Sequence, residues 1–163
     1  MGAYCTYTFF VKKEYKQNKN YFDMADTVLS LTGNKKIGTL MKEFNEKYPY
    51  LIIKFKNKTI KQFFANKDGF KTFSDDETIA SARKINSTGE ISIADNKMFK
   101  TLSSEFEIKY GMYMYIGVVD EKGSRILYHS FIDDGDGSPF GKKTLSELND
   151  ISKKNGAVKG EWK

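Results

Sequence analysis

The sequence predicts an α+β fold in which an antiparallel sheet carries helices packed on one face. Segments with helical spacing of apolar residues alternate with short apolar runs of strand length. A block of sequence at 39–48 also recurs at 101–110. With 163 residues, 39% of them hydrophobic, the chain has the size of one domain that can bury its own core. We therefore expect a single fused domain over 1–163, built from two tandem related units of αββα type.

Residues 1–35 are expected to precede these units as an extension. The apolar run in 4–12 predicts a strand, and residues near 21–32 predict a helix. No Gly/Ser/Pro-rich linker separates the later parts of the chain, which favours one fused domain over two independent ones.

The repeated block defines the two units, 36–93 and 94–163. Residues 39–48 read TLMKEFNEKY and residues 101–110 read TLSSEFEIKY, and six of the ten positions agree. In each block a leucine, a phenylalanine and a tyrosine follow one another at four-residue spacing, which is typical of the buried face of a helix. These residues are Leu40, Phe44 and Tyr48 in the first block and Leu102, Phe106 and Tyr110 in the second. Helices are therefore predicted over 37–48 and 98–110, the second ending at Gly111.

In the first unit, strands are predicted over 50–56 and 60–65 and a helix over 77–84. Leu51, Ile53 and Phe55 alternate with Ile52, Lys54 and Lys56, so one face of the first strand is apolar and the other is increasingly basic.

In the second unit, the elements follow a βαββα(β) order, ferredoxin-like or similar. Strands are expected at 90–93, 112–119 and 124–132, a helix at 143–154, and a short closing strand near Val158. Because 112–119 is apolar on both faces, it is predicted to be a central strand. Asp120 to Gly123 is the expected hairpin turn.

Charge is concentrated in the first part of the chain. Through Gln62 there are twelve lysines against five acids, a balance of +7, whereas the remainder balances at −1. Only two of the 27 basic residues are arginine, and lysine lacks the planar fork that reads base edges. Sequence-specific DNA recognition is therefore disfavoured, and attraction to an acidic partner remains.

The strongest candidate for a binding surface is a set of lysines with interleaved tyrosines. They are Lys12, Lys13, Lys16, Lys19, Lys54, Lys56, Lys58, Lys61, Tyr15 and Tyr21. We expect a non-enzymatic interaction protein that presents this surface to an acidic protein or nucleoprotein complex. A sequence-nonspecific binder of RNA or single-stranded nucleic acid is the first alternative. Lysines on an edge strand also prevent aggregation without any ligand.

The acidic turn 133–138 (DDGDGS) provides the second alternative, a small metal-dependent enzyme. As an EF-hand starting at Asp134 it fails, because Pro139 replaces the required glycine and Leu145 the bidentate glutamate. The acids are equally typical of a solvated loop before a helix.

The sequence shows no set of residues typical of nucleophilic catalysis, zinc binding or nucleotide binding. His129 and Cys5 are the only histidine and cysteine, and no glycine-rich phosphate loop is present. We therefore predict no catalytic residue, no metal ligand and no cofactor. The start of the chain lacks the pattern of a signal peptide, and no apolar run has the length of a membrane span, so we expect a cytoplasmic protein.

The string EFNEKYPYLIIKF at 43–55 and the later segment TLSELN at 144–149 resemble a group of small bacterial α+β proteins. Those proteins share an EFNEx[FY]PYL helix-to-strand junction and a TLxExN segment. The resemblance covers about 36–155 and implies no function or site. Small lysine-rich bacterial proteins of this kind are often encoded by phages or mobile elements, where inhibitors of host nucleoprotein complexes are common.

Overall fold

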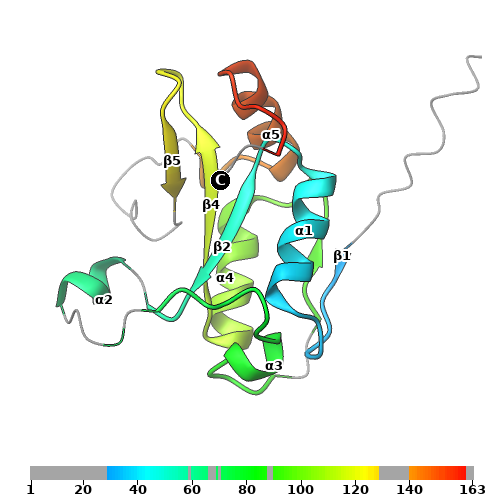
Figure 1. Ribbon diagram of the computed structural model, residues 1–163, viewed down its shortest axis with the longest axis vertical. Helices are drawn as coiled ribbons and strands as arrows, with labels where there is room; N and C mark the ends of the chain where they lie inside the picture. Colours follow the sequence, from blue (N-terminus) through cyan, green and yellow to red (C-terminus); the bar gives the residue numbers. More distant parts are fainter. Residues whose placement is uncertain are drawn as a thin grey trace, which may run out of the picture.

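The structure is a computed structural model that describes residues 29–58, 60–65, 69, 71–87, 90–128 and 140–160 (Figure 1). Of residues 30, 60, 61 and 63 only the backbone is described. The elements in chain order are β1 (Leu29–Ser30), α1 (Ile37–Lys47), β2 (Ile52–Lys56), α2 (Ile60–Ala65), α3 (Ile79–Ala82), β3 (Ser92–Ile93), α4 (Phe99–Tyr110), β4 (Tyr113–Val119), β5 (Arg125–Tyr128) and α5 (Leu145–Lys154). The predicted mixture of helices with an antiparallel sheet is confirmed.

The larger sheet has the strand order β2-β4-β5 with antiparallel pairing throughout. The central position of β4 agrees with its apolar character on both faces. β1 and β3 form a separate two-stranded antiparallel sheet in which Ser30 lies opposite Ser92. Within the described residues, β3 therefore pairs with β1 and with no strand of the larger sheet.

One apolar core joins α1, β2, α4 and β4. Phe44 of α1 and Phe106 of α4 are completely buried, as the four-residue spacing predicts. The Phe106 ring lies 4.8 Å from the ring of Phe55 on β2. Ile53 of β2 and Ile116 of β4 face the same core. Burial of this apolar area is the main stabilising contribution to the fold.

The starts of the helices are joined in pairs by backbone hydrogen bonds. The Ile37 N–H donates to the Glu77 carbonyl at 2.8 Å, and the Ile79 N–H donates to the Lys35 carbonyl at 3.0 Å. An isolated antiparallel bridge, Lys36 to Thr78, lies between these bonds. The start of α1 is thus fixed to the start of α3.

The same arrangement joins α4 to α5. The Phe99 N–H donates to the Lys143 carbonyl at 3.1 Å, and the Leu145 N–H donates to the Lys97 carbonyl at 3.0 Å. We call two residues equivalent when they have the same separation in sequence as Leu40 and Leu102. Near α3 and α5, the separation used is that between Thr78 and Thr144. Under this alignment, the four residues that form the second pair of bonds are the equivalents of the four residues that form the first pair.

Side chains follow the same correspondence. The ion pair between Lys35 and Glu43 spans 2.6 Å, and the ion pair between their equivalents, Lys97 and Glu105, has the same length. Thr78 and Thr144 each cap the following helix in a capping box. Gly111 ends α4 with a φ of 62°, the left-handed conformation expected of a glycine in that position.

The chain segments that return after β2 and β4 differ. After β4, a tight turn leads into β5, which pairs over four residues. After β2, the predicted strand at 60–65 is wrong: these residues form helix α2, which lies beyond the end of β2 (Figure 1). The chain meets β2 only later, at a single bridge between Lys56 and Thr72. Ile60 to Ala65 therefore contributes no strand to the sheet.

Two further predictions need correction. The helix expected near 21–32 does not include residues 29–30, which form β1 because Ser92–Ile93 pairs with them. Val158 is in no strand and is 49% exposed. The strand expected at 4–12 lies outside the described residues.

Candidate partner-binding surface

The lysines of β2 lie on the face of the sheet that is turned away from the apolar core. Side chains alternate along a strand, so the burial of Ile53 and Phe55 in the core places Lys54 and Lys56 on the opposite face. The register sets Lys54 opposite Tyr115 and Lys56 opposite Tyr113. Two lysines and two tyrosines therefore share one face of neighbouring strands.

Contacts between these side chains fix the position of one ammonium group. The Nζ of Lys56 lies 4.8 Å from the centroid of the Tyr115 ring, a cation–π contact. Burial lowers the pKa of Lys56, because desolvation disfavours the charged form. The Tyr115 ring is only 1% exposed. This tyrosine thus supports the lysine and does not offer a ring face to a ligand.

A further lysine reaches this surface from the segment after α3. The Nζ of Lys84 lies 5.9 Å from the Tyr113 ring and donates a hydrogen bond to the Asn57 carbonyl. Sequence reasoning missed Lys84, because the sequence does not show that Tyr113 pairs with Lys56. We call Lys54, Lys56, Lys58 and Lys84 the lysine face.

The structure brings together only part of the predicted set. Lys54 and Lys56 lie on one strand face, and Lys58 follows just after β2, where its carbonyl accepts a hydrogen bond from the Tyr115 hydroxyl at 3.5 Å. Lys61 belongs to α2, and its side chain is not described. The remaining members lie outside the described residues: Lys12, Lys13, Lys16, Lys19, Tyr15 and Tyr21.

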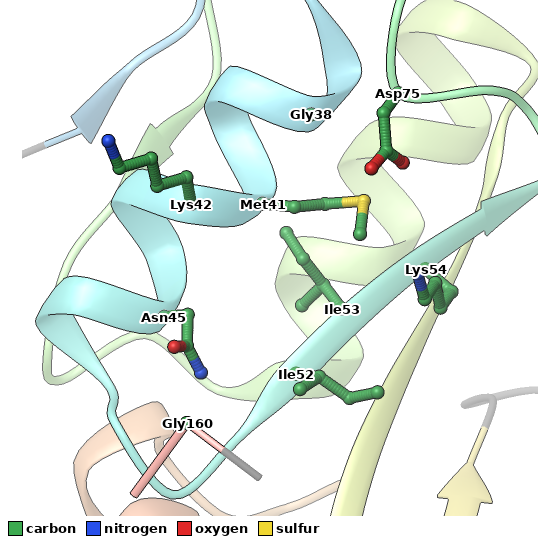
Figure 2. Close-up of a pocket in the computed structure, with 9 residues that line it drawn as sticks. All are labelled: Gly38, Met41, Lys42, Asn45, Ile52, Ile53, Lys54, Asp75 and Gly160. Atoms are coloured by element: carbon green, nitrogen blue, oxygen red, sulfur yellow. The ribbon is translucent and has the colours of Figure 1, made fainter. Parts of the chain in front are cut away.

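A groove of about 250 Å³ runs beside β2, between this strand and α1 (Figure 2). Met41 extends from α1 across the groove, and Ile53 and Lys54 line it from β2. Asp75 closes one end, above Gly38 at the start of α1. The Lys42 side chain points away from β2. Lys54 is therefore the cation that belongs to both the groove and the lysine face.

Two other hollows in the described part of the chain have mixed charge. One of about 670 Å³ separates the β4–β5 hairpin from α5, with Ile126, Phe140 and Ile151 among charged residues of both signs. Another of about 360 Å³ contains Arg83, Glu90 and the Tyr110 ring. Burial raises the pKa of Tyr110, and the charge of Glu90 acts in the same direction while that of Arg83 opposes it. Neither hollow combines the groups of a recognisable reaction.

The described residues form neither a metal cluster nor a membrane span. Among them, no three or more His, Cys, Asp or Glu side chains are grouped so that they could hold a metal ion. None of the described helices has the length and apolar character needed to span a bilayer. The acidic turn 133–138, His129 and Cys5 all lie outside the described residues.

Comparison with known proteins gives no match: no family model, no curated protein and no solved structure is similar to this chain at a significant level.

Proposed function

We propose that the protein is a non-enzymatic interaction protein whose lysine face binds an acidic surface of a protein or nucleoprotein partner. The observation that carries this proposal is the gathering of Lys54 and Lys56 on one strand face, with Lys84 added from a distant segment. Clustered cations accelerate encounter with acidic partners and disfavour basic ones.

An acidic protein fits this surface better than a nucleic acid. Binding of single strands relies on aromatic rings on which bases can stack. The Tyr115 ring is buried beneath Lys56 and is closed to a base. The cations of the lysine face are all lysines, which bind as point charges and do not read bases. Nucleic acid therefore remains as an outcome of the test, supported mainly by the half-buried Tyr113.

We further infer that the two parts of the chain, 36–93 and 94–163, are related units fused into one domain, with 1–35 as an extension. The paired helix starts, the matching ion pairs and the two capping boxes all recur at equivalent residues. In the smaller sheet, Ser30 lies opposite its own equivalent, Ser92. This supports an approximate twofold relation between the units.

The function is tested by charge reversal with a matched control. The double variant Lys54→Glu with Lys58→Glu should lose partners captured from a bacterial lysate by about tenfold or more, corresponding to ~1.4 kcal/mol. The control, Lys122→Glu with Lys142→Glu, changes the net charge equally at exposed positions outside the lysine face and should retain them. Unchanged melting temperatures establish that both variants fold.

Nuclease treatment separates the partner classes. Partners that survive nuclease and are lost only in the Lys54/Lys58 variant support an acidic protein. Partners that disappear with nuclease, with affinity that falls steeply as salt rises, support nucleic acid instead. Equal loss in both variants contradicts a role specific to the lysine face.

A further inference from the structure

The outer edge of β2 carries backbone groups directed away from the sheet. The Phe73 N–H donates to the Phe55 carbonyl, and the Asn57 N–H donates to the Lys71 carbonyl, both at 3.1 Å and both on the side away from β4. Backbone groups alternate in direction along a strand, so the N–H and carbonyl of Ile53 point to this outer edge as well. Among the described residues, neither group of Ile53 has a hydrogen-bond partner.

The corresponding edge of β4 is occupied. Ile116 of β4 pairs with Tyr128 of β5, and Val118 pairs with Ile126. On β2, the returning segment pairs only at Lys56, through Thr72. The groove between Met41 and Ile53 lies where pairing on β2 stops (Figure 2). β5 thus shows what kind of segment fits such an edge: a short antiparallel strand.

We propose that the edge of β2 at Ile52–Lys54 takes up an extended segment of the acidic partner as an added antiparallel strand. This inference rests on the proposed function and states how the partner binds. Strand addition supplies backbone hydrogen bonds, and pockets for alternate side chains supply specificity.

The side chains beside this edge define the segment that fits. A residue opposite Ile53 faces the core side, where Met41 offers apolar contact. A residue opposite Lys54 lies on the lysine face, where a carboxylate forms a favourable cross-strand pair. Asp75 closes the groove, so the segment is short. An apolar residue flanked by acidic residues meets these requirements.

The test uses three peptide probes on the full chain, followed by NMR. The first is acetyl-Thr-Val-Glu-Val-Glu-Val-Thr-amide, the second has lysine in place of glutamate, and the third is the first with alternate backbone nitrogens methylated on the pairing side. At millimolar concentration, the first peptide should shift the amides of Ile52 to Lys54 and slow the hydrogen exchange of the Ile53 N–H. The methylated peptide should do neither, and the lysine peptide should bind several-fold more weakly.

A charge swap at the edge provides the matched comparison. Lys54→Glu should reverse the preference, so that the lysine peptide now binds better than the glutamate peptide. Lys122→Glu, at an exposed position in the turn between β4 and β5, should leave the order unchanged. If Lys122→Glu has the same effect as Lys54→Glu, the assignment to this edge is wrong.

The remaining outcomes separate failure of this inference from failure of the proposed function. Shifts spread over the lysine face without protection of Ile53 keep the acidic partner and overturn strand addition. Equal binding of the glutamate and lysine peptides at Ile52–Lys54 overturns the acidic segment. Absence of any shift with any peptide overturns the docking edge, whatever the capture experiment shows. Slow exchange of the Ile53 N–H in the free protein overturns it too, because another part of the chain would then already pair with this edge.

Discussion

Strands β2 and β4 follow similar helices but differ in the segment that returns to pair beside each of them. Each strand follows a helix whose start is fixed to that of a later helix by the same backbone hydrogen bonds. β4 then pairs with β5 over four residues, whereas β2 forms only a single bridge with the returning chain, between Lys56 and Thr72. The backbone hydrogen bonds between helix starts are therefore common to both regions, whereas the segment that returns beside each strand differs between them.

The largest effect is expected in the core, at the buried phenylalanines of α1 and α4. Phe44 and Phe106 are equivalent residues and are both fully buried. Phe44→Ala and Phe106→Ala should each lower the free energy of unfolding by about 3–5 kcal/mol, through lost transfer energy and a residual cavity. Urea unfolding measures both. A loss below about 1 kcal/mol in one of them would show that the two positions differ in their packing.

A smaller effect is expected where the helix starts meet. A Cβ on Gly38 would lie 2.8 Å from the Cβ of Asp75 and 2.9 Å from its carbonyl oxygen. At the start of α4 the small residue is on the other partner: the Lys100 N–H donates to the Gly141 carbonyl, as the Gly38 N–H does to that of Asp75. Gly38→Ala should therefore cost about 1–3 kcal/mol by overpacking.

The contact between Lys100 and Gly141 also suggests a way to restore part of this stability. Adding Asp75→Gly to Gly38→Ala removes the Cβ clash and leaves the carbonyl contact, so part of the lost stability should return. The comparison is a double-mutant cycle measured by thermal unfolding. Strict additivity of the two changes would mean that these residues do not crowd one another.

The smallest effect concerns a polar position on the two long helices. Asn45 donates from Nδ2 to the Leu51 carbonyl at 2.8 Å, whereas its equivalent, Glu107, is a carboxyl whose pKa is raised by burial. A raised folded pKa means that stability increases as pH falls through that pKa and is lower when Glu107 is ionised. Glu107→Gln should raise stability at neutral pH by less than about 1 kcal/mol.

The pH dependence provides the check on Glu107. The wild type should gain stability relative to Glu107→Gln as the pH is lowered from neutral toward the ordinary pKa of a glutamate. Stability curves that remain parallel over this range would show that burial of Glu107 does not disfavour its charge.

Helical periodicity was the most reliable signal in the sequence. The stripes through Phe44 and Phe106 predicted both ends of α1 and α4 closely, because one buried face determines the whole helix. The central place of β4 followed from two apolar faces. In these elements, the local pattern of apolar residues is enough to indicate which side chains are buried in the folded protein.

The failures have a common physical origin. Residues 60–65 resemble a strand, but no neighbouring strand in the described sheet pairs with them, and they form α2. β1 is very short and depends on pairing with Ser92–Ile93, far along the chain. Such elements are fixed by their partners, which local propensity does not reveal.

The candidate site was predicted in part for the same reason. Alternation along β2 placed Lys54 and Lys56 on one face, as the structure shows. The approach of Lys84 and the burial of Tyr115 depend on register and on a distant loop, so the sequence held no sign of them. Predicting the groove beside Ile53 would have required knowledge that the returning chain pairs with β2 only at Lys56.

The joined helix starts also bear on the order in which the chain folds. Lys36 and Thr78 are far apart in the sequence, as are Met98 and Thr144, yet each pair is bridged through the backbone. The first turn of α1 thus completes its hydrogen bonds only after a long loop has closed, and such closures slow folding. Once closed, α1 and α3 should open together, so their first amides should exchange with solvent at a common rate.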